Sequence, residues 1–179
     1  MIRSLIPRTT LFGPRQLTTC LSTRSIFQSR PKMSPVPIVV CGRNSDIAKK
    51  VGTALLPECD AIHIILSVES GISDIPALLA SKTPSNASDN FGSQNYSKRP
   101  LAVAVGGGFS DDMFDQMKDA CKDVPEPVWL RVDTSKMEGP PAPGMAETYG
   151  AAIADRLKKR VKELGIGKEG GASEGVYFF

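Results

Sequence analysis

The sequence predicts an α/β fold, a three-layer Rossmann-like or flavodoxin-like sandwich with a mainly parallel four-stranded sheet. Short apolar runs with almost no polar interruption are typical of strands covered on both faces. Four such runs occur along the chain, at residues 36–41, 61–67, 101–105 and 127–132. A segment with a helical spacing of apolar residues follows each run. With right-handed crossovers between the strands, this alternation predicts the strand order 2-1-3-4.

The first run leads through a tight polar turn into a helix. Gly42 directly follows residues 36–41, and the predicted helix begins three residues after Gly42. Ser45 is the predicted N-cap, because its hydroxyl can accept a hydrogen bond from an early backbone N–H. Asp46 places negative charge where a helix start favours it, and Pro57 ends the helix.

The second run, residues 61–67, is interrupted only by His63, which we expect to be a buried core residue. A short helix over residues 73–80 follows. Residues 81–99 are rich in Ser, Asn, Lys and Gly, and this composition predicts a mobile loop or insertion. A solvated excursion is the favoured interpretation, and a substrate lid is the alternative.

The third run, residues 101–105, enters the glycine turn 106–108 directly. Ser110 is the predicted N-cap of the next helix. The apolar side of that helix consists of Met113, Phe114, Met117, Ala120 and Cys121. Met and Phe at this spacing indicate a core-facing stripe.

The last quarter of the chain predicts one long helix and an apolar tail. Residues 127–132 form the fourth run, and a Pro- and Gly-rich link leads to a helix over residues 146–164. One face of this helix is apolar, and the other carries a run of charges typical of a solvated surface. Residues 176–179 are too apolar to lie free in water, so we expect them to dock on the domain or pair along a sheet edge, with a homodimer contact as the alternative.

Charge is distributed unevenly between the N-terminal segment and the rest of the chain. Removing residues 1–32 leaves 16 basic and 19 acidic residues, a net charge of −3, which gives no support for nucleic-acid binding. The removed segment lacks acidic residues and is rich in Ser and Thr; its basic residues are Arg3, Arg8, Arg15, Arg24, Arg30 and Lys32.

This composition predicts that residues 1–33 are a disordered mitochondrial transit-type leader and that residues 34–179 form a single domain in the matrix. Met33 stands just before the first predicted strand. Initiation there would produce a cytosolic form without the leader. No segment is long and apolar enough to predict a membrane span.

The cysteines predict neither a disulfide framework nor a structural metal site. Cys20 lies in the leader, and Cys41, Cys59 and Cys121 have no C-x-x-C spacing. The single histidine has no close-set partners that would complete a zinc site. We therefore expect three reduced, buried thiols.

The candidate binding site is the crevice between the first and third strands. In the order 2-1-3-4, strand order reverses there, and ligands of such sheets bind beyond the carboxyl ends of the strands. Two glycine-bearing turns, residues 42–45 and 106–110, would face each other across this crevice. Glycine permits close approach of a ligand to the backbone, and N–H groups at a helix start attract phosphate.

The segment Cys-Gly-Arg-Asn-Ser-Asp-Ile-Ala at residues 41–48 resembles the T-G-x-x-x-G-I-G/A opening of short-chain dehydrogenase/reductases. The resemblance covers about a dozen residues, including a loose similarity of the turn at 105–108 to the family's N-A-G turn. It implies a Rossmann-like fold that binds NADP or NAD. The cofactor-binding residues that we predict are Gly42, Arg43, Asn44, Ser45, Glu69, Gly106, Gly107 and Gly108.

Two of these residues have more specific predicted roles. The resemblance implies that Arg43 favours a 2′-phosphate, and Glu69, just beyond the second strand, can hold a ribose hydroxyl. The chain departs from the family: Asp46 replaces the second glycine, Asp111 and Asp112 bring further negative charge to the second turn, the family's Tyr-x-x-x-Lys pair is absent, and the chain is shorter than the family usually needs for a substrate region. No catalytic residue is therefore predicted.

Three functions follow from the sequence as alternatives. The leading one is a nucleotide-cofactor-binding domain, oxidoreductase-related, with NADP or NAD as the cofactor. The second is a non-enzymatic interaction or regulatory module that uses the apolar tail. The third is a metal-assisted phosphate-ester enzyme that would use Asp46, Asp111 and Asp112.

Overall fold

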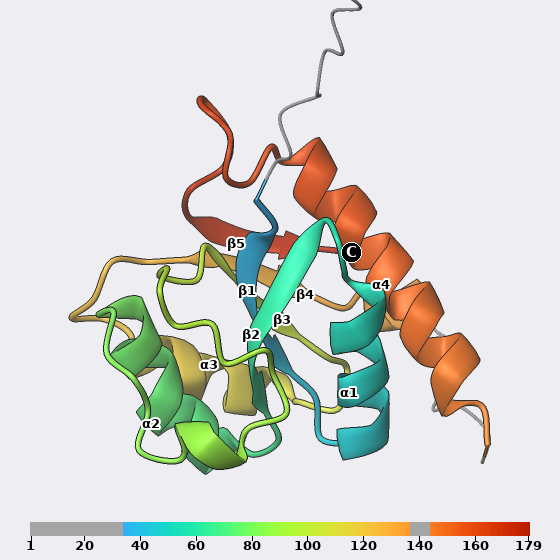
Figure 1. The fold of residues 1–179 in the computed structure, drawn as a ribbon, viewed down its shortest axis with the longest axis horizontal. Coiled ribbons are helices and arrows are strands. Elements are labelled where there is room, and N and C mark those ends of the chain that lie inside the picture. The colour runs from blue at the N-terminus through green and yellow to red at the C-terminus, as the bar shows by residue number, and fades with distance from the viewer. Residues whose placement is uncertain (1–33, 137–143) are drawn as a thin grey trace, which may run out of the picture. The chain divides into compact units, whose positions relative to one another are not determined.

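All four predicted strands form in a computed structural model of the protein, which describes residues 34–136 and 144–179. They belong to one parallel sheet, joined by a further strand at the C-terminal end (Figure 1). The strand order is β2-β1-β3-β4-β5. The strands are β1 (Val36–Cys41), β2 (Cys59–Ile65), β3 (Ala102–Val105), β4 (Val128–Arg131) and β5 (Gly175–Phe178). The predicted leader lies outside the described residues.

Helices cover both faces of this sheet, as predicted for a three-layer α/β fold. Helices α1 and α4 pack together on one face, and α2 and α3 pack together on the other (Figure 1). The helices are α1 (Ser45–Ala54), α2 (Val68–Leu79), α3 (Asp111–Asp119) and α4 (Ala146–Glu163), with short 3₁₀ turns η1 (Ala87–Asp89) and η2 (Thr134–Lys136).

The alternation of side chains along the strands divides the core into two clusters. Ile38 and Val40 of β1 face α1 and α4, whereas Val39 and Cys41 face α2 and α3. Trp129 of β4 is fully buried in the second cluster, edge-on to the ring of Phe114. Both faces of the central strands are therefore buried, which explains their almost continuous apolar sequences.

The sheet has five strands, so the predicted number of four is wrong by one. The apolar tail forms β5, which pairs in parallel with β4 along the sheet edge, in register Trp129 with Val176. Edge pairing was one of the outcomes expected for this tail. The predicted order 2-1-3-4 is retained, with β5 added beyond β4.

The last connection leads to β5, the strand that was not predicted, and it differs from the right-handed crossovers expected between the four predicted strands. The chain moves across the sheet from β1 to β2 in one direction and from β4 to β5 in the other, yet α1 and α4 cover the same face. The β4–α4–β5 crossover is therefore left-handed. The preference for right-handed crossovers arises where the helix that follows a strand packs directly back onto the same sheet. Here the link from β4 to α4 is long, and residues 137–143 of it lie outside the described residues.

Two predicted helix starts need correction. The N-cap of α1 is Asn44 and not Ser45, because the Asn44 side chain accepts hydrogen bonds from the N–H groups of Asp46 and Ile47. Helix α2 begins at residue 68 and not 73, since Ser67 provides its cap. The predicted cap of α3 is confirmed: Ser110 accepts from the N–H of Met113.

Part of the segment predicted as a mobile loop packs along the free edge of β2. The side chain of Asn90 imitates a neighbouring strand: its oxygen accepts from the N–H of Ile64, and its nitrogen donates to the Ile64 carbonyl, both at 2.8 Å. The backbone N–H groups of Ser93 and Gln94 donate to carbonyls of β2. These contacts satisfy edge groups that would otherwise be open to pairing with another chain.

Candidate functional site

A pocket of about 420 Å³ opens at the carboxyl ends of β1 and β3, on the face covered by α1 and α4. This is the point at which the strand order reverses. The pocket is lined by Val40, Cys41, Gly42, Arg43, Asn44, Ile47, Ala48, Val51, Ala104, Gly106, Gly107, Gly108, Val132, Thr134, Tyr149, Ile153, Leu157 and Phe179. Its volume lies within the range of small-molecule sites in proteins.

The first glycine turn forms one side of the mouth of this pocket. The Gly42 N–H donates to the Ile65 carbonyl at 2.8 Å, which ties the turn to β2. A methyl group added at Gly42 would lie 3.3 Å from the Cβ of Ala48, so the turn runs close over the first turns of α1. The side chain of Asn44 caps two backbone N–H groups of that helix, at 3.0 and 3.1 Å.

The second glycine turn lies directly against the first. The Gly106 N–H donates to the carbonyl of Cys41 at 2.8 Å, and a methyl group at Gly106 would lie 3.0 Å from that oxygen. A methyl group at Gly108 would lie 3.5 Å from the side chain of Arg43. Any larger residue at Gly106 would therefore push the two turns apart, and the structure brings both turns to the same opening.

Two of the eight predicted site residues do not line the pocket. Ser45 lies in the first turn of α1, and Glu69 is exposed at the start of α2. Hydrogen bonds from the backbone N–H of Glu69 and from Ser67, together with the charge of Arg43, lower the pKa of the Glu69 carboxyl. Arg43, which lines the pocket, therefore lies close enough to Glu69 to favour the charged form of its carboxyl.

Below its mouth, the pocket has hydrocarbon walls. They consist of Val40 and Ala104 from the sheet, Ala48 and Val51 from α1, and Ile153 and Leu157 from α4. The two helices approach closely at Gly150, where an added methyl group would lie 2.9 Å from the Cβ of Lys50. Sequence reasoning missed this part of the site, because α4 reaches this face only through the left-handed crossover.

The thiol at the end of β1 is not activated. Burial, and to a smaller extent the neighbouring Cys121, raise the pKa of Cys41 far above its usual range. Burial also raises the pKa of Cys121 to about 11. Cys41, Cys59 and Cys121 are free and buried, as expected from the sequence.

A second, more polar cavity of about 450 Å³ adjoins the pocket on the other side of the second glycine turn. The two share Gly106, Gly107, Val132 and Thr134. Arg131 lies within this second cavity, 2.7 Å from Asp111 and 4.5 Å above the centre of the Phe114 ring. Across the residues that the structure describes, no group of three or more His, Cys, Asp or Glu side chains is arranged to hold a metal ion.

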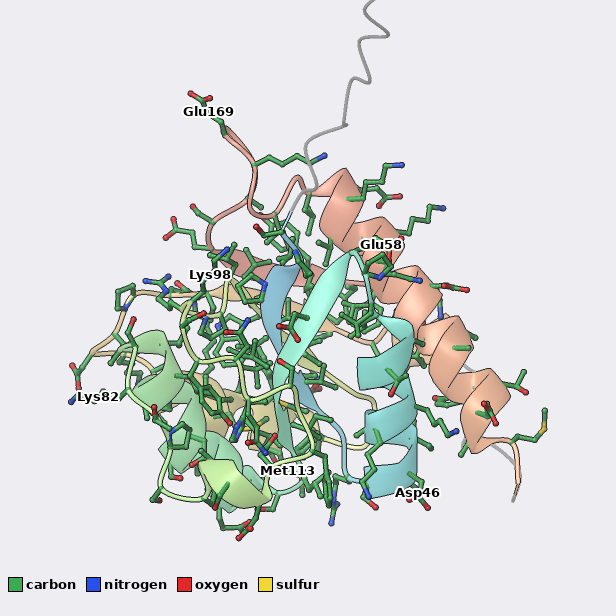
Figure 2. All side chains as sticks on the ribbon, viewed as in Figure 1. Asp46, Glu58, Lys82, Lys98, Met113 and Glu169 are labelled. Atoms are coloured by element: carbon green, nitrogen blue, oxygen red, sulfur yellow. The ribbon has the colours of Figure 1, made fainter. Side chains whose placement is uncertain are left out.

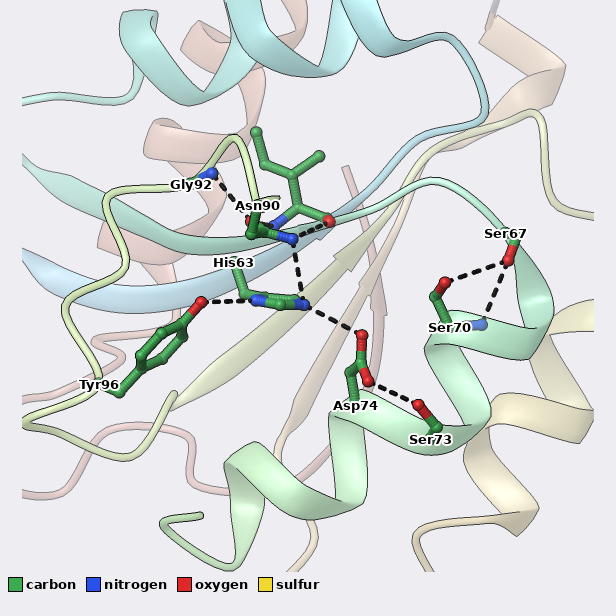
Figure 3. A network of polar contacts seen from close by, with 9 residues as sticks. His63, Ser67, Ser70, Ser73, Asp74, Asn90, Gly92 and Tyr96 are labelled. Atoms are coloured by element: carbon green, nitrogen blue, oxygen red, sulfur yellow. Dashed lines mark hydrogen bonds and ion pairs between the residues drawn. The ribbon is translucent and has the colours of Figure 1, made fainter. Parts of the chain in front are cut away.

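A separate polar cluster lies buried beside β2 (Figure 3). His63 is completely buried and Asp74 is 3% exposed, and His63 Nε2 lies 3.2 Å from Asp74 Oδ2. The other ring nitrogen, Nδ1, lies 2.9 Å from the Tyr96 hydroxyl. Asn90 and Ser73 complete the cluster, with Ser73 donating to Asp74 at 2.6 Å.

The donors and acceptors around His63 place opposite requirements on its Nε2 atom. The amide of Asn90 is oriented by its bonds to Ile64 and Gly92, so its nitrogen faces Nε2 and can only donate, which requires a lone pair on Nε2. A carboxylate oxygen of Asp74 can only accept, which requires a proton on Nε2. The Tyr96 hydroxyl can donate to Nδ1 or accept from it, so it fits either tautomer.

This cluster confirms the prediction that His63 is a hydrogen-bonded core residue. Its partners were missed, although Asp74 lies four residues before Leu78 on the buried side of α2, which is an indication of a buried acid with a partner. Burial lowers the pKa of His63, and the hydrogen bond to Asp74 opposes this effect.

Comparison with known proteins adds one relative. No protein-family model matches the chain, and no solved structure matches it. None of the helices in residues 34–136 and 144–179 has the length and apolar character that a bilayer crossing requires. Over 133 residues the chain is 35% identical to kojic acid related protein 6 of Aspergillus oryzae (strain ATCC 42149 / RIB 40), covering 72% of this chain and 77% of that protein. The chain belongs to the same family as kojic acid related protein 6.

Proposed function

We propose that the mouth of the pocket binds the phosphate groups of a nucleotide cofactor, with NADP and NAD as the first candidates. The observation that carries this proposal is the meeting of two glycine turns at the point where strand order reverses. Nucleotides bind at this place in open α/β sheets.

The phosphate contacts come from the turns and not from the first turn of α1. Asn44 already occupies the N–H groups of Asp46 and Ile47, and Asp46 carries its negative charge at that end of the helix (Figure 2). The N–H groups of Gly42 and Gly106 are engaged as well, by the carbonyls of Ile65 and Cys41. Turn residues 43, 44, 107 and 108, with the exposed cation of Arg43, are the groups that we propose to meet a phosphate. Glu69 beside Arg43 weakens that attraction in part.

The resemblance to short-chain dehydrogenase/reductases supports this proposal through Gly42, Ile47 and Ala48. It does not extend to the catalytic Tyr-x-x-x-Lys pair, so we propose cofactor binding in an oxidoreductase-related role and assign no reaction. We further propose a mitochondrial matrix location, with a cytosolic form that starts at Met33, from the composition of residues 1–32.

Thermal unfolding of the full chain tests the proposal. The compounds are NADP, NAD, FMN and ATP, with kojic acid added because of the relative's name. A nucleotide at 100 times its dissociation constant stabilises the folded state by about 2.7 kcal/mol. The midpoint should then rise by about 5 to 10 °C.

Gly42→Asp should abolish this rise, because a carboxylate at the turn repels phosphate. Ala151→Asp adds the same charge at an exposed position of α4 away from the pocket and should leave the rise unchanged. Absence of a rise with every nucleotide would refute the proposal.

The alternative function, a module that binds a partner or forms a homodimer through the C-terminal tail, is favoured by the geometry of β5. Phe179 directs its N–H and carbonyl toward β4, so Val176 and Phe178 direct theirs to the open edge. Their side chains are 37% and 53% exposed. Sedimentation of the full chain across concentrations, with Phe178→Lys as the disrupting variant, tests this alternative.

A further inference from the structure

The free edge of β2 is covered by one short segment, the edge loop (residues 90–96). The backbone N–H groups of Ser93 and Gln94 donate to carbonyls of β2. The side chain of Asn90 bonds both backbone groups of Ile64, each at 2.8 Å. These bonds occupy backbone groups of β2 that would otherwise face water or another strand.

The side chain that connects the edge loop with the interior is His63, which is completely buried (Figure 3). Its Nδ1 lies 2.9 Å from the Tyr96 hydroxyl, and its Nε2 lies 3.2 Å from Asn90 Nδ2, both at the loop. Nε2 also lies 3.2 Å from Asp74 Oδ2 of α2. Across residues 34–136 and 144–179, Asp74 and Tyr96 are the titratable side chains bonded to His63; Glu69, the other acid of α2, is exposed, and β1 has no charged residue. One titratable ring therefore joins the loop to α2.

Proton uptake by this ring has opposite effects on its contacts with the loop and with α2. The neutral ring can present a lone pair at Nε2, to which the Asn90 amide can donate. The protonated ring has an N–H on both nitrogens, so Nε2 and the Asn90 nitrogen face each other as two donors. Asp74 still accepts from the protonated ring and gains a charge pair with it. A proton therefore strengthens the bond to α2 and opposes the Asn90 contact that holds the loop.

Opening of the loop also changes the affinity of His63 for a proton. In the closed form, burial lowers the pKa of His63. With the loop detached, the ring meets water, where its pKa is about 6.5. The open form thus binds a proton more tightly, and acid shifts the equilibrium toward it. Ser93, Gln94 and Asn95 are already exposed, so the loop can detach without uncovering a large apolar surface.

We infer that the edge loop is an acid-sensitive closure of the β2 edge: it stays bonded while His63 is neutral and detaches when His63 takes up a proton. Detachment exposes the backbone groups of Ile64 that Asn90 otherwise bonds. The inference goes beyond the proposed function, because the edge loop does not line the pocket at the carboxyl edge and its opening requires no nucleotide.

Hydrogen exchange of the full chain, followed residue by residue by NMR at pH 7.5 and pH 5.5, tests the inference. Protection factors correct for the effect of pH on the intrinsic exchange rate. Those of the Ile64, Ser93 and Gln94 amides should fall by as much as about tenfold at the lower pH, since the open form takes up a proton near pH 6.5. The Ala172 amide, which donates to Leu164 outside the cluster, is the control and should keep its protection. Amides of the central strand β1 should stay better protected than the loop amides at both pH values.

His63→Gln removes the only histidine of the chain, so its loop amides should have equal protection at both pH values. If this variant does not fold, NMR titration of the wild-type imidazole gives the midpoint of proton uptake, and the protection of the loop amides should fall with the same midpoint. Wild-type protection that does not change with pH, or an equal fall in His63→Gln, would overturn the inference. Loop amides that exchange no faster than those of β1 would also overturn it, because the loop would then open only with the whole fold.

Discussion

The β2 edge and the carboxyl edge of the sheet both bring loops into contact with strands, but they use their polar groups differently. At the β2 edge, His63, Asp74, Asn90 and Tyr96 bind one another and the strand backbone. At the carboxyl edge, the turns at 42–44 and 106–108 surround an opening. The first region uses its polar groups to hold the chain together, and the second presents them to the pocket.

This difference teaches that the most unusual side chains in a fold need not mark its binding site. A buried His–Asp pair is often interpreted as part of a catalytic site. Here the pair belongs to a cluster that holds residues 90–96 against the edge strand β2. The pocket, in contrast, is built from glycines and small aliphatic residues. Substitutions at the two edges should therefore have opposite effects: large losses of stability at one, and changed binding with small losses at the other.

The largest expected effect is that of Asp74→Ala. It removes the buried carboxylate that contacts His63 Nε2 and accepts from Ser73, and should lower the free energy of unfolding by about 3 kcal/mol. Urea denaturation measures the loss, and hydrogen exchange at residues 90–96 should become faster. Glu69→Ala, on the exposed side of the same helix, is the control and should change stability by less than about 0.5 kcal/mol. Similar losses in both variants would show that the cluster does not hold the edge.

A smaller loss is expected from Gly92→Ala. The added methyl group would lie 2.6 Å from the Ile62 carbonyl oxygen and 2.7 Å from the His63 nitrogen, both backbone atoms that cannot rotate away. The loop must shift, which should cost about 2 kcal/mol by the same denaturation measurement. Ser93→Ala, which retains the backbone bond to Ala61, should cost little. A Gly92→Ala protein of wild-type stability would mean that the loop is not packed on β2 as described.

The pH dependence of stability should report the same cluster. Because the folded-state pKa of His63 is lowered, the unfolded chain takes up a proton at higher pH than the folded chain does. Stability is therefore fully present above about pH 6.5, the unfolded value, and is lost as pH falls below it. The slope can reach about 1.4 kcal/mol per pH unit for this single group.

His63→Gln removes the only histidine in the chain, so its stability should be nearly flat between pH 7 and 5.5. Equal slopes for wild type and His63→Gln over that range would assign the dependence to other groups.

Much of the fold was predictable, because the buried strands of a parallel sheet leave continuous apolar runs in the sequence. The residues of β1 were predicted without error, whereas the boundaries of β2 and α2 shifted by several residues. Ser67 can extend a strand or cap a helix, and only tertiary packing decides between the two. The segment that forms β5 was recognised as an apolar tail and not as a fifth strand, because four residues are too few to show the apolar periodicity of a strand.

The candidate site was predictable at its mouth and not below it. A glycine at a strand end allows the tight turn that follows the strand, and this requirement is local, so Gly42 and Gly106 could be found from the sequence. The walls from α4 depend on the hand of the last crossover, which no local pattern reveals. The partners of His63 were equally inaccessible, because Asn90 and Tyr96 lie 27 and 33 residues farther along the chain.

The smallest expected effect is that of Ala104→Leu, which we compare with the same substitution at a second alanine of the same strand. Ala102 and Ala104 both belong to β3 and face α1 and α4, but only Ala104 lines the pocket. Ala102→Leu should cost about 1 to 3 kcal/mol, because extra methylenes in a packed core force neighbours out of position. Ala104→Leu should change the free energy of unfolding by less than about 1 kcal/mol, since the added carbons enter the pocket. Urea denaturation of both variants measures the difference. Equal losses would mean that the pocket walls are as tightly packed as the rest of the core.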